Sequence, residues 1–385
     1  MQTALYIQSD PDIHQQTSLF DVEVGYSAAK FPEEIWKSLM KDDLEGYRLH
    51  LAFDSANVQG FKTGYLAIKK NQVVVCLAPF FITDYHLDTT VQGKLKSLLQ
   101  KVREKIPFLM RIKILCVGSP ITDACKMTMH PEYPYDPDIL QALNEQLQKI
   151  ASKSGASVIA FKDVLAKDLQ KYGAKLNQLG YSTVKNMPVA VNRIDFATLE
   201  DYYTSLSYAT RKDLRRKIKK SAHIEIKEYQ GMPPNIEEIH ALYLETYERS
   251  DLKFEKLTST FFEFTAGLMP QNTRFVLYYS DQRLIAFNML LHNEHTLMDK
   301  YIGMHQPLAA DNNIYFLSWM YNIEMCLRDG LTRFQSGQAS YEVKKKLGAS
   351  LEDTYILFKH TNRLLNQPLA CLAKLLAYEN FDANL

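Results

Sequence analysis

The sequence predicts an α/β (α+β) protein of two domains, each a mixed, mostly antiparallel sheet flanked by helices. Its 385 residues exceed the roughly 100–200 residues of one typical domain. Strand and helix patterns alternate through both halves, and a strand that contains Pro188 gives way to a helical region near residue 195. We therefore expect an N-terminal domain at residues 1–194 and a C-terminal domain at residues 195–385.

The composition is typical of a soluble globular protein, with 46% hydrophobic and 23% charged residues. A net charge of +1 gives no overall field that would attract nucleic acid or an anionic membrane. Five cysteines without a C-x-x-C pair indicate buried thiols in a reducing compartment and no metal site. The first residues do not resemble a signal peptide, and no stretch approaches the ~20 apolar residues of a membrane helix. We therefore expect a cytoplasmic protein.

The first half reads as alternating strands and helices. Two β-rich runs flank Asn71 and Gln72 and predict an antiparallel hairpin. A helix is predicted from Asp136 to Gly155, because an acidic residue stands near its start and a glycine follows its end. The predicted strands cover residues 64–70, 73–82, 111–121, 156–164 and 182–194, and the predicted helices cover residues 93–105, 136–155 and 168–180.

In the second half, three strands follow one another directly and a long helix then ends at Gly330. From residue 223 onward the order is β-α-α-β-β-β-α-β-α-β. The predicted strands cover residues 223–229, 273–280, 283–292, 296–305, 333–337 and 353–360, and the predicted helices cover residues 198–207, 210–220, 235–250, 258–268, 312–330, 340–348 and 362–379.

Two motifs lie close together in this half. A Y-x-G-M segment at residues 301–304 is followed by a helix and then by G-Q-x-x-Y-E-x-K-x-x-L-G at residues 337–348. The stretch that carries them, residues 298–348, resembles the BioF2-like, FemAB-related branch of the GNAT acyltransferases. Softer matches, such as the basic run YATRKDLRRKIKK, extend the resemblance over most of the chain. It implies tandem GNAT-like domains, in which two central strands splay apart and seat the donor.

The resemblance also implies an N-acyltransferase that moves an acyl or aminoacyl group from an acyl-CoA-type donor to a small-molecule amine acceptor. Ordinary acetyl-CoA members carry a glycine-containing loop whose backbone amides bind the CoA pyrophosphate. The equivalent residues here, 305–316, contain no glycine, although Asn312 or Asn313 could cap the following helix. A FemAB-like aminoacyl-tRNA donor and a catalytically inactive binding module therefore stay open as alternatives. No permanently bound cofactor is expected, and the oligomeric state is open.

Lys344 is the first candidate catalytic residue, because the resemblance puts a functional lysine in the K-x-x-L-G element. Its ammonium would offset charge on the reacting carbonyl or bind a donor phosphate. The alternative is a solvated lysine, since residues 344–346 are all lysine. Tyr341 lies three residues earlier, so one helical face can carry both side chains. Its hydroxyl would donate to a carbonyl or protonate a thiolate, and the alternative is an ordinary core tyrosine.

Asp299, Tyr301 and His305 alternate along one predicted strand, and a period of two would put them on one face. On that face His305 or Asp299 would take the proton of the acceptor amine, with Asp299 and Tyr301 as substrate-binding candidates. The alternative for His305 is a structural role. Gln338 follows a glycine at a strand end, where its amide would bind the acceptor or satisfy a turn.

A basic helix is predicted at residues 210–220, with seven cations and one acid. Leu214 and Ile218 give it one apolar stripe, so the cations lie on its flanks. Arg211 and Arg215 are candidates to bind phosphates of CoA or of a tRNA acceptor stem, and such contacts would be salt-dependent. The alternative is a solvated amphipathic helix.

Overall fold

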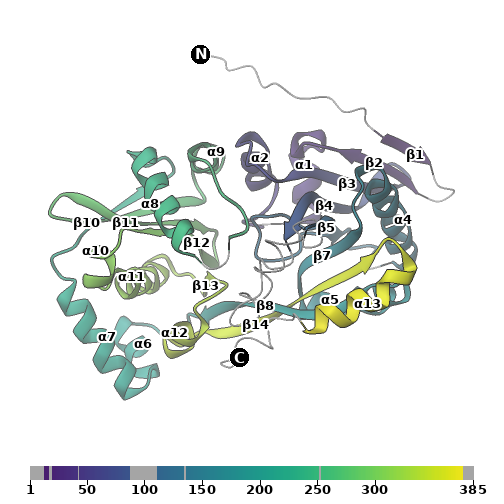
Figure 1. Cartoon of the computed structure of the whole chain (residues 1–385). Helices are drawn as coiled ribbons and strands as arrows, with labels where there is room; N and C mark the ends of the chain where they lie inside the picture. The colour runs from purple at the N-terminus through teal and green to yellow at the C-terminus, as the bar shows by residue number, and fades with distance from the viewer. Residues whose placement is uncertain are drawn as a thin grey trace, which may run out of the picture.

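The computed structural model contains one continuous mixed sheet of 14 strands that runs through both halves of the chain (Figure 1). It describes residues 13–16, 20–41, 43–86, 111–133, 136–250 and 253–375. The predicted α/β class is confirmed. The strands are β1 (Ile13–Gln16), β2 (Asp21–Gly25), β3 (Lys62–Lys70), β4 (Val73–His86), β5 (Arg111–Val117), β6 (Thr128–Met129), β7 (Val158–Leu165), β8 (Ser182–Arg193), β9 (Glu225–Gln230), β10 (Thr273–Ser280), β11 (Arg283–His292), β12 (Thr296–Met304), β13 (Arg333–Gly337) and β14 (Ser350–His360).

The strand order across the sheet is β1-β2-β3-β4-β5-β7-β14-β8-β13-β12-β11-β10-β9, and β6 pairs with β4 beside this path. Among the helices of the described residues, none is both long and apolar enough to span a bilayer. The helices are α1 (Glu33–Leu39), α2 (Tyr47–Ser55), α4 (Pro137–Ser154), α5 (Ala166–Gln178), α6 (Leu199–Ser205), α7 (Tyr208–Lys220), α8 (Ile236–Arg249), α9 (Ser259–Leu268), α10 (Leu308–Asp311), α11 (Ile314–Asp329), α12 (Tyr341–Lys346) and α13 (Arg363–Leu375).

The local signals of the first half are confirmed where the structure describes them. β3 and β4 form the predicted hairpin, and its two turn residues, Asn71 and Gln72, have positive φ values of 51° and 67°. Such turns match the twist of the strands they join. α4 begins after Asp136, whose carboxylate accepts from a first-turn amide, and ends at Gly155 with φ 73°. The predicted helix at residues 93–105 lies outside the described residues.

In the second half, β9 to β12 are antiparallel neighbours, and α11 leads from β12 to the parallel strand β13. One face of these strands packs against α6, α7 and α11, and the other packs against α8 and α9. The core on the α8/α9 face also takes in α2 of the first half. The rings of Phe53 and Phe261 lie 6.3 Å apart there. The two halves therefore share an apolar core as well as a sheet.

β14, the last strand of the described residues, returns to the first half. β14 lies between β7 and β8, and β8 in turn lies between β14 and β13. In Figure 1, β14 runs from beside α12 across to the first half, next to α5 and α13. The domain boundary near residue 194 stays a prediction. The sequence did not indicate this exchange of strands, which fixes the two halves relative to each other through main-chain hydrogen bonds.

Four register shifts fall on neighbouring strands where the halves meet. Each adds one residue to a strand relative to its partner: Lys300 in β12, Ser336 in β13, one of residues 187–188 in β8 and one of residues 162–163 in β7. A bulge re-aims side chains and leaves backbone groups outside the regular ladder. The middle of the sheet therefore presents redirected side chains, and carbonyls outside the regular ladder, at the junction of the halves.

Candidate active site

β12 and β13 run side by side for only three residue pairs, 296–298 with 333–335, and then diverge. Asp299 is the first residue of β12 beyond this pairing. At Gly337 the φ is +68°, and an added Cβ would lie 3.8 Å from Oδ2 of Asp123 and 3.9 Å from the carbonyl oxygen of Asp299. A carboxylate from the first half therefore reaches the point where the two strands separate.

Lys344 is buried, with 5% of its surface exposed. Its ammonium donates to the carbonyl oxygens of Ser336 at 2.5 Å and of Gly337 and Gln338 at 3.2 Å. The alternative interpretation as a solvated lysine is therefore wrong. Burial lowers the pKa of Lys344 to about 8, although two nearby carboxylates act in the opposite direction. Because an ammonium has three N–H bonds, these carbonyls use all of them, and Lys344 ties down the end of β13 and the residue that follows it.

Tyr341 and Gln338 satisfy carbonyls at the bulge of β8. The hydroxyl of Tyr341 donates to the carbonyl oxygen of Pro188 at 2.8 Å, and Nε2 of Gln338 donates to that of Met187 at 2.9 Å. The Gln338 amide also lies 3.3 Å from Oδ1 of Asp163. These contacts match the structural alternatives for both residues. Their roles in catalysis and substrate binding stay predictions.

The prediction that Asp299 shares a face with Tyr301 and His305 is wrong. The bulge at Lys300 sets Asp299 opposite Leu290, on the α11 face, whereas Tyr301 lies on the α8/α9 face. The carboxylate of Asp299 accepts from Nδ2 of Asn288 at 2.9 and 3.0 Å and from Nδ2 of Asn322 at 3.4 Å. Burial raises the pKa of Asp299 to about 6, against the hydrogen bond from Asn288 and the charge of Lys344.

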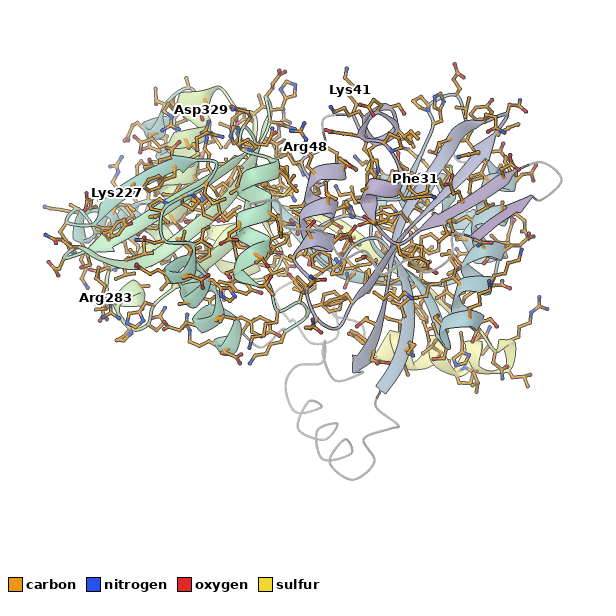
Figure 2. The ribbon with its side chains drawn as sticks, turned by 90° about the horizontal axis from the view of Figure 1, so that it is seen from above. Phe31, Lys41, Arg48, Lys227, Arg283 and Asp329 are labelled. Atoms are coloured by element: carbon orange, nitrogen blue, oxygen red, sulfur yellow. The ribbon has the colours of Figure 1, made fainter. Side chains whose placement is uncertain are left out.

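Tyr301 and His305 have separate surroundings on the α8/α9 face. Tyr301 packs edge-on against rings of α8 and α9, and its hydroxyl donates to Oε1 of Glu255 at 3.3 Å. His305 lies past the end of β12, with Nδ1 2.8 Å from Oε2 of Glu245 and Nε2 2.9 Å from the guanidinium of Arg283. Arg283 lies near the outer end of the second half (Figure 2). His305 therefore contacts Glu245 and Arg283 rather than Lys344 or Tyr341, the other predicted catalytic residues.

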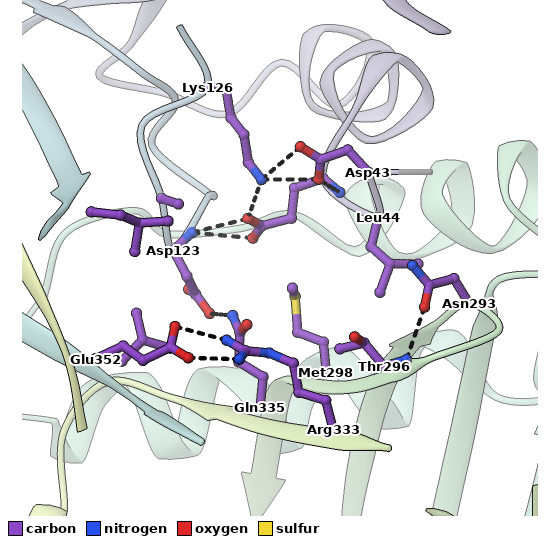
Figure 3. A pocket seen from close by; sticks show the side chains of 14 residues that line it. Asp43, Leu44, Asp123, Lys126, Asn293, Thr296, Met298, Arg333, Gln335 and Glu352 are labelled. Atoms are coloured by element: carbon purple, nitrogen blue, oxygen red, sulfur yellow. Dashed lines mark hydrogen bonds and ion pairs between the residues drawn. The ribbon is translucent and has the colours of Figure 1, made fainter. Parts of the chain in front are cut away.

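A pocket of about 200 Å³ lies between the halves, directly beside the point where β12 and β13 diverge (Figure 3). Met298 and Gln335, the last residues paired between these strands, line it. Its charged lining residues are four acids, Asp43, Glu45, Asp123 and Glu352, and two bases, Lys126 and Arg333. The lining therefore carries an excess of carboxylates.

A buried ion network holds one wall of this pocket. Glu45 is 1% exposed and contacts the ammonium of Lys300 at 2.5 Å and that of Lys126 at 3.0 Å. Burial alone would raise the pKa of Glu45, but the two ammonium groups lower it to about 2. Lys300 also lies 3.5 Å from Oδ1 of Asp123, whose Oδ2 accepts from Nε2 of Gln335 at 2.8 Å. These contacts position Asp123 at the inner end of the pocket.

Sequence reasoning missed Glu45, Asp123, Lys126 and Lys300. They come from three distant segments, and none belongs to a short motif. A period of two along the strand would put Lys300 on the face opposite Asp299 and Tyr301. The bulge at this residue is what aims its side chain at Glu45. For Lys300, the one available signal was its charge within the mostly apolar strand β12, next to Asp299.

The sequence model of the FemAB-like family, described as peptidoglycan biosynthesis/recognition, matches residues 113–374, more than half of the chain. The chain belongs to the FemAB-like family. It has the GNAT fold, which it shares with FemX and with a tandem GNAT protein. No curated protein sequence matches the chain.

Solved structures confirm the tandem GNAT-like fold. FemX has a TM-score of 0.51 at 12% identity and covers 82% of this chain and 91% of its own. A tandem GNAT protein from the clavulanic acid biosynthesis pathway has a TM-score of 0.51 at 11% identity, over 82% and 88% of the two chains. The C-terminal domain (DUF2156) of a putative lysylphosphatidylglycerol synthetase from Agrobacterium fabrum has a TM-score of 0.51 at 14% identity, over 93% and 99%.

In this FemAB-like chain, the residues that replace the CoA loop form a helical turn. Within α10 and its ends, the amides of Ala309 and of residues 311–313 donate to carbonyls of residues 305–310. The predicted capping of α11 is corrected: Asn313 occupies the N-cap position with φ 52°, but its side chain makes no cap hydrogen bond. Nδ2 of Asn312 donates instead to the carbonyl oxygen of Leu308 at 3.0 Å. These four amides are thus engaged within the chain.

The basic helix α7 forms as predicted, at the far end of the second half (Figure 1). Arg211 donates to carbonyl oxygens of residues 203, 204 and 206 at 3.3–3.4 Å, at the end of α6. Arg215 pairs with Glu200 and stacks over the ring of Tyr203 at 5.0 Å. Both arginines therefore join α6 to α7, and their binding of substrate phosphates stays a prediction. Lys212, Lys219 and Lys220 are exposed on the same helix.

Proposed function

We propose that this FemAB-like protein transfers an acyl or aminoacyl group to an amine acceptor that binds in the pocket between its halves. The observation that carries the proposal is the position of this acid-rich pocket beside the divergence of β12 and β13. The donor carbonyl would enter between the diverging strands, and the acceptor would approach it from the pocket. Orientation of this kind supplies a large part of the rate of acyl transfer, about 7–11 kcal/mol.

The pocket suits a cationic acceptor. Free amines are protonated near neutral pH, and carboxylates in a partly dry pocket attract them. Glu45 is matched by two ammonium groups, and Glu352 makes a bidentate pair with Arg333 at 2.6 and 2.9 Å. Asp123 has a more distant ammonium, at 3.5 Å from Lys300, and lies closest to the diverging strands. We assign it the task of taking the proton from the attacking amine.

Lys344 would act through its charge. Its three N–H bonds go to backbone carbonyls, so it offers the donor carbonyl a nearby cation rather than a hydrogen bond. A preorganised cation beside a developing oxyanion contributes on the order of 3 kcal/mol. Gln338 and Tyr341 would keep the same loop rigid by their bonds to β8. The predicted catalytic role of His305 finds no support in its contacts with Glu245 and Arg283.

Two donor classes remain, and one observation favours aminoacyl-tRNA over acyl-CoA. A CoA pyrophosphate needs several unbonded backbone amides at the start of the helix. The amides of Ala309 and residues 311–313 are already bonded within the turn. A tRNA donor would instead use cations such as those exposed on α7, with binding that weakens as salt rises.

The test is a transfer assay on the full chain. A panel of small amines is incubated with either acyl-CoAs or bulk aminoacyl-tRNA, and N-acylated products are detected by mass spectrometry. Asp123→Asn should lower transfer at least about 10²-fold, the scale of a lost general base. Asp281→Asn, in an exposed turn, is the matched control and should leave transfer unchanged.

Each outcome has a clear meaning. Equal transfer by the Asp123→Asn variant would overturn the assignment of the base. Product from acyl-CoA alone would reverse the choice of donor. If neither donor yields product while one of them still binds, the chain is a binding module of this fold.

A further inference from the structure

A second pocket, of about 670 Å³, opens on the first half of the chain, and we call it the α4 pocket. It lies on the face of the sheet that α4 covers, because Ile82 of β4 and Ile150 of α4 line it and also belong to the core on that face. Ser154, the last residue of α4, forms part of its wall, so the pocket opens where this helix ends. Ligand pockets of proteins commonly enclose about 300–1,000 Å³. The α4 pocket therefore has room for a small organic molecule.

The α4 pocket is distinct from the acceptor pocket between the halves. Among the described residues, the two pockets have no lining residue in common. Lys113, near the start of β5, lines the α4 pocket, whereas Asp123, in the segment that follows β5, lines the acceptor pocket. The acceptor pocket has an excess of carboxylates, but the described lining of the α4 pocket has three lysines, Lys62, Lys113 and Lys153, and one acid, Asp84. The two pockets therefore suit ligands of opposite charge.

The three lysines come from three elements and converge on the same side of the sheet. Lys62 lies opposite Ile82 in the pairing of β3 with β4, and Lys113 lies opposite Asp84 in the pairing of β4 with β5. Residues directly opposite each other in antiparallel strands share a face, and so do residues two apart along one strand. Lys62, Asp84 and Lys113 therefore all project from the face to which Ile82 belongs. Lys153 approaches the same pocket from the last turn of α4.

Contacts inside the chain hold two of these ammonium groups at the rim. Nζ of Lys113 donates to the carbonyl oxygen of Ser154 at 3.3 Å, and Nζ of Lys62 lies 4.7 Å from the ring centre of Tyr26. A cation beside the last carbonyls of a helix offsets its dipole, and one lysine is enough for that purpose. An ammonium has three N–H bonds, so the bond to Ser154 leaves Lys113 able to bind a further acceptor. All three lysines are exposed, so an anion can reach them from solvent.

The lining selects the kind of anion by its charge and by its number of acceptors. Three ammonium groups and one carboxylate leave the described lining with a formal charge of +2. A phosphomonoester carries about −1.5 to −2 charges near neutral pH and presents three terminal oxygens, one for each ammonium. A carboxylate or a phosphodiester carries a single negative charge. Lysine binds phosphate as a point charge, without a fixed geometry to satisfy. The apolar side chains of Ile82 and Ile150 suit a carbon body attached to the phosphate.

We propose that the α4 pocket binds a phosphomonoester carried on an apolar body. This site does not depend on the proposed transferase function, because its described lining shares no residue with the acceptor pocket. Phosphomonoesters occur in soluble metabolites and in the headgroup of phosphatidic acid, and both sources present the same dianion. Calorimetry tests the chemistry of the group, and vesicles then separate its two sources.

The first measurement compares three anions by isothermal titration calorimetry on the full chain at low ionic strength. Phenyl phosphate should bind at least about fivefold tighter than phenyl sulfate, which has a similar shape and one negative charge fewer. It should also bind at least about fivefold tighter than inorganic phosphate, which has no apolar body to cover Ile82 and Ile150. Equal affinity for phenyl phosphate and either of the other anions would overturn the proposal. So would the absence of binding, which would leave the three lysines as a solvated rim.

Variants at the rim test the assigned residues in both directions. Lys113→Met and Lys153→Met should each weaken the binding of phenyl phosphate at least about threefold, whereas Asp84→Asn should tighten it about two- to threefold, because a carboxylate no longer opposes the anion. Tighter binding cannot result from a damaged fold. Lys227→Met and Asp281→Asn, at exposed positions of the second half, are the matched controls and should leave the affinity unchanged; Lys227 lies near its outer end (Figure 2). Unchanged affinity in all three rim variants would place the anion elsewhere and overturn the proposal.

Vesicles identify the source of the phosphate group. The chain is sedimented with phosphatidylcholine vesicles that contain either phosphatidic acid, a phosphomonoester, or phosphatidylglycerol, a phosphodiester. Binding that requires phosphatidic acid, and that Lys113→Met weakens, would assign the pocket to a lipid headgroup. Absence of vesicle binding, with phenyl phosphate still bound, would assign it to a soluble phosphomonoester. Equal binding to both kinds of vesicle would show no selectivity for the monoester and would count against the proposal.

Discussion

Replacement of Lys344 by methionine separates the electrostatic role of this residue from its structural one. Methionine keeps an unbranched apolar stem of similar length and removes only the ammonium. Two opposing effects set the stability of this variant. The carbonyls of residues 336–338 lose a charged donor, and at about 1–1.5 kcal/mol each this costs about 3–5 kcal/mol.

The opposing effect is the relief of a buried charge. A pKa lowered from 10.5 to about 8 means that folding disfavours the ammonium by about 3 kcal/mol at neutral pH. The variant has no such cost, so its net destabilisation should be only about 0–2 kcal/mol, and it should fold. Transfer activity should nevertheless fall at least about 10²-fold, because the cation near the donor carbonyl is gone.

The pH dependence of stability gives an independent check on the same residue. Between pH 8 and 10.5, the unfolded chain retains a proton on Lys344 that the folded chain releases. Wild-type stability should therefore rise across this window by up to about 3 kcal/mol relative to the methionine variant. Urea unfolding at several pH values measures the difference. Lys346→Met, which removes an exposed ion pair with Glu342, is the control and should change stability by less than about 1 kcal/mol.

Two results would refute this reasoning. Unchanged turnover in Lys344→Met would remove the residue from the mechanism and leave it a structural tie. A stability difference that stays flat between pH 8 and 10.5 would mean that the ammonium is not held in the buried, pKa-lowered state on which both estimates depend.

Three further predictions follow from the junction of the halves. Glu45→Gln should destabilise the protein by about 3 kcal/mol in urea unfolding, because Lys126 and Lys300 lose their buried partner; a change below about 1 kcal/mol would contradict this. The raised pKa of Asp299 means that the folded chain holds its proton up to about pH 6, so stability should fall as pH rises from about 4 to 6. Asp299→Asn should lack that fall in melting curves, and a parallel profile would argue against a buried carboxylate. Gly337→Ala should cost about 1–2 kcal/mol through its positive φ alone, since its Cβ meets only ordinary contacts.

The sequence predicted the elements that are fixed by local signals. The β3–β4 hairpin, the cap and end of α4, and the order of strands and helices along the second half follow from turn residues and periodicity, and the structure confirms them. The motif at residues 337–348 also led to the point where β12 and β13 diverge. Both kinds of evidence depend on residues close together in the chain.

What the sequence could not predict depends on distant segments. No pattern indicates that β14 inserts between β7 and β8, because any strand with one apolar face satisfies the same periodicity. The bulge at Lys300 reverses the faces assigned by counting in twos, which is why Asp299 was misplaced. Lys344 stands in a run of three lysines, and only the carbonyls supplied by the end of β13 explain its burial.

The spacing of the family motif has a physical reason in these bulges. The strands that cross between the halves carry extra residues in β8 and β13, and each extra residue presents carbonyls that the ladder does not pair. Gln338, Tyr341 and Lys344, three residues apart, donate to these carbonyls in turn. The acceptors are the carbonyl oxygens of Met187, of Pro188 and of the end of β13. The same three contacts hold the backbone around Gly337, where an added Cβ would lie 3.8 Å from Oδ2 of Asp123 and 3.9 Å from the carbonyl oxygen of Asp299. The motif therefore secures the strand exchange and the approach of Asp123 to β12 together, so a substitution in it should disturb both.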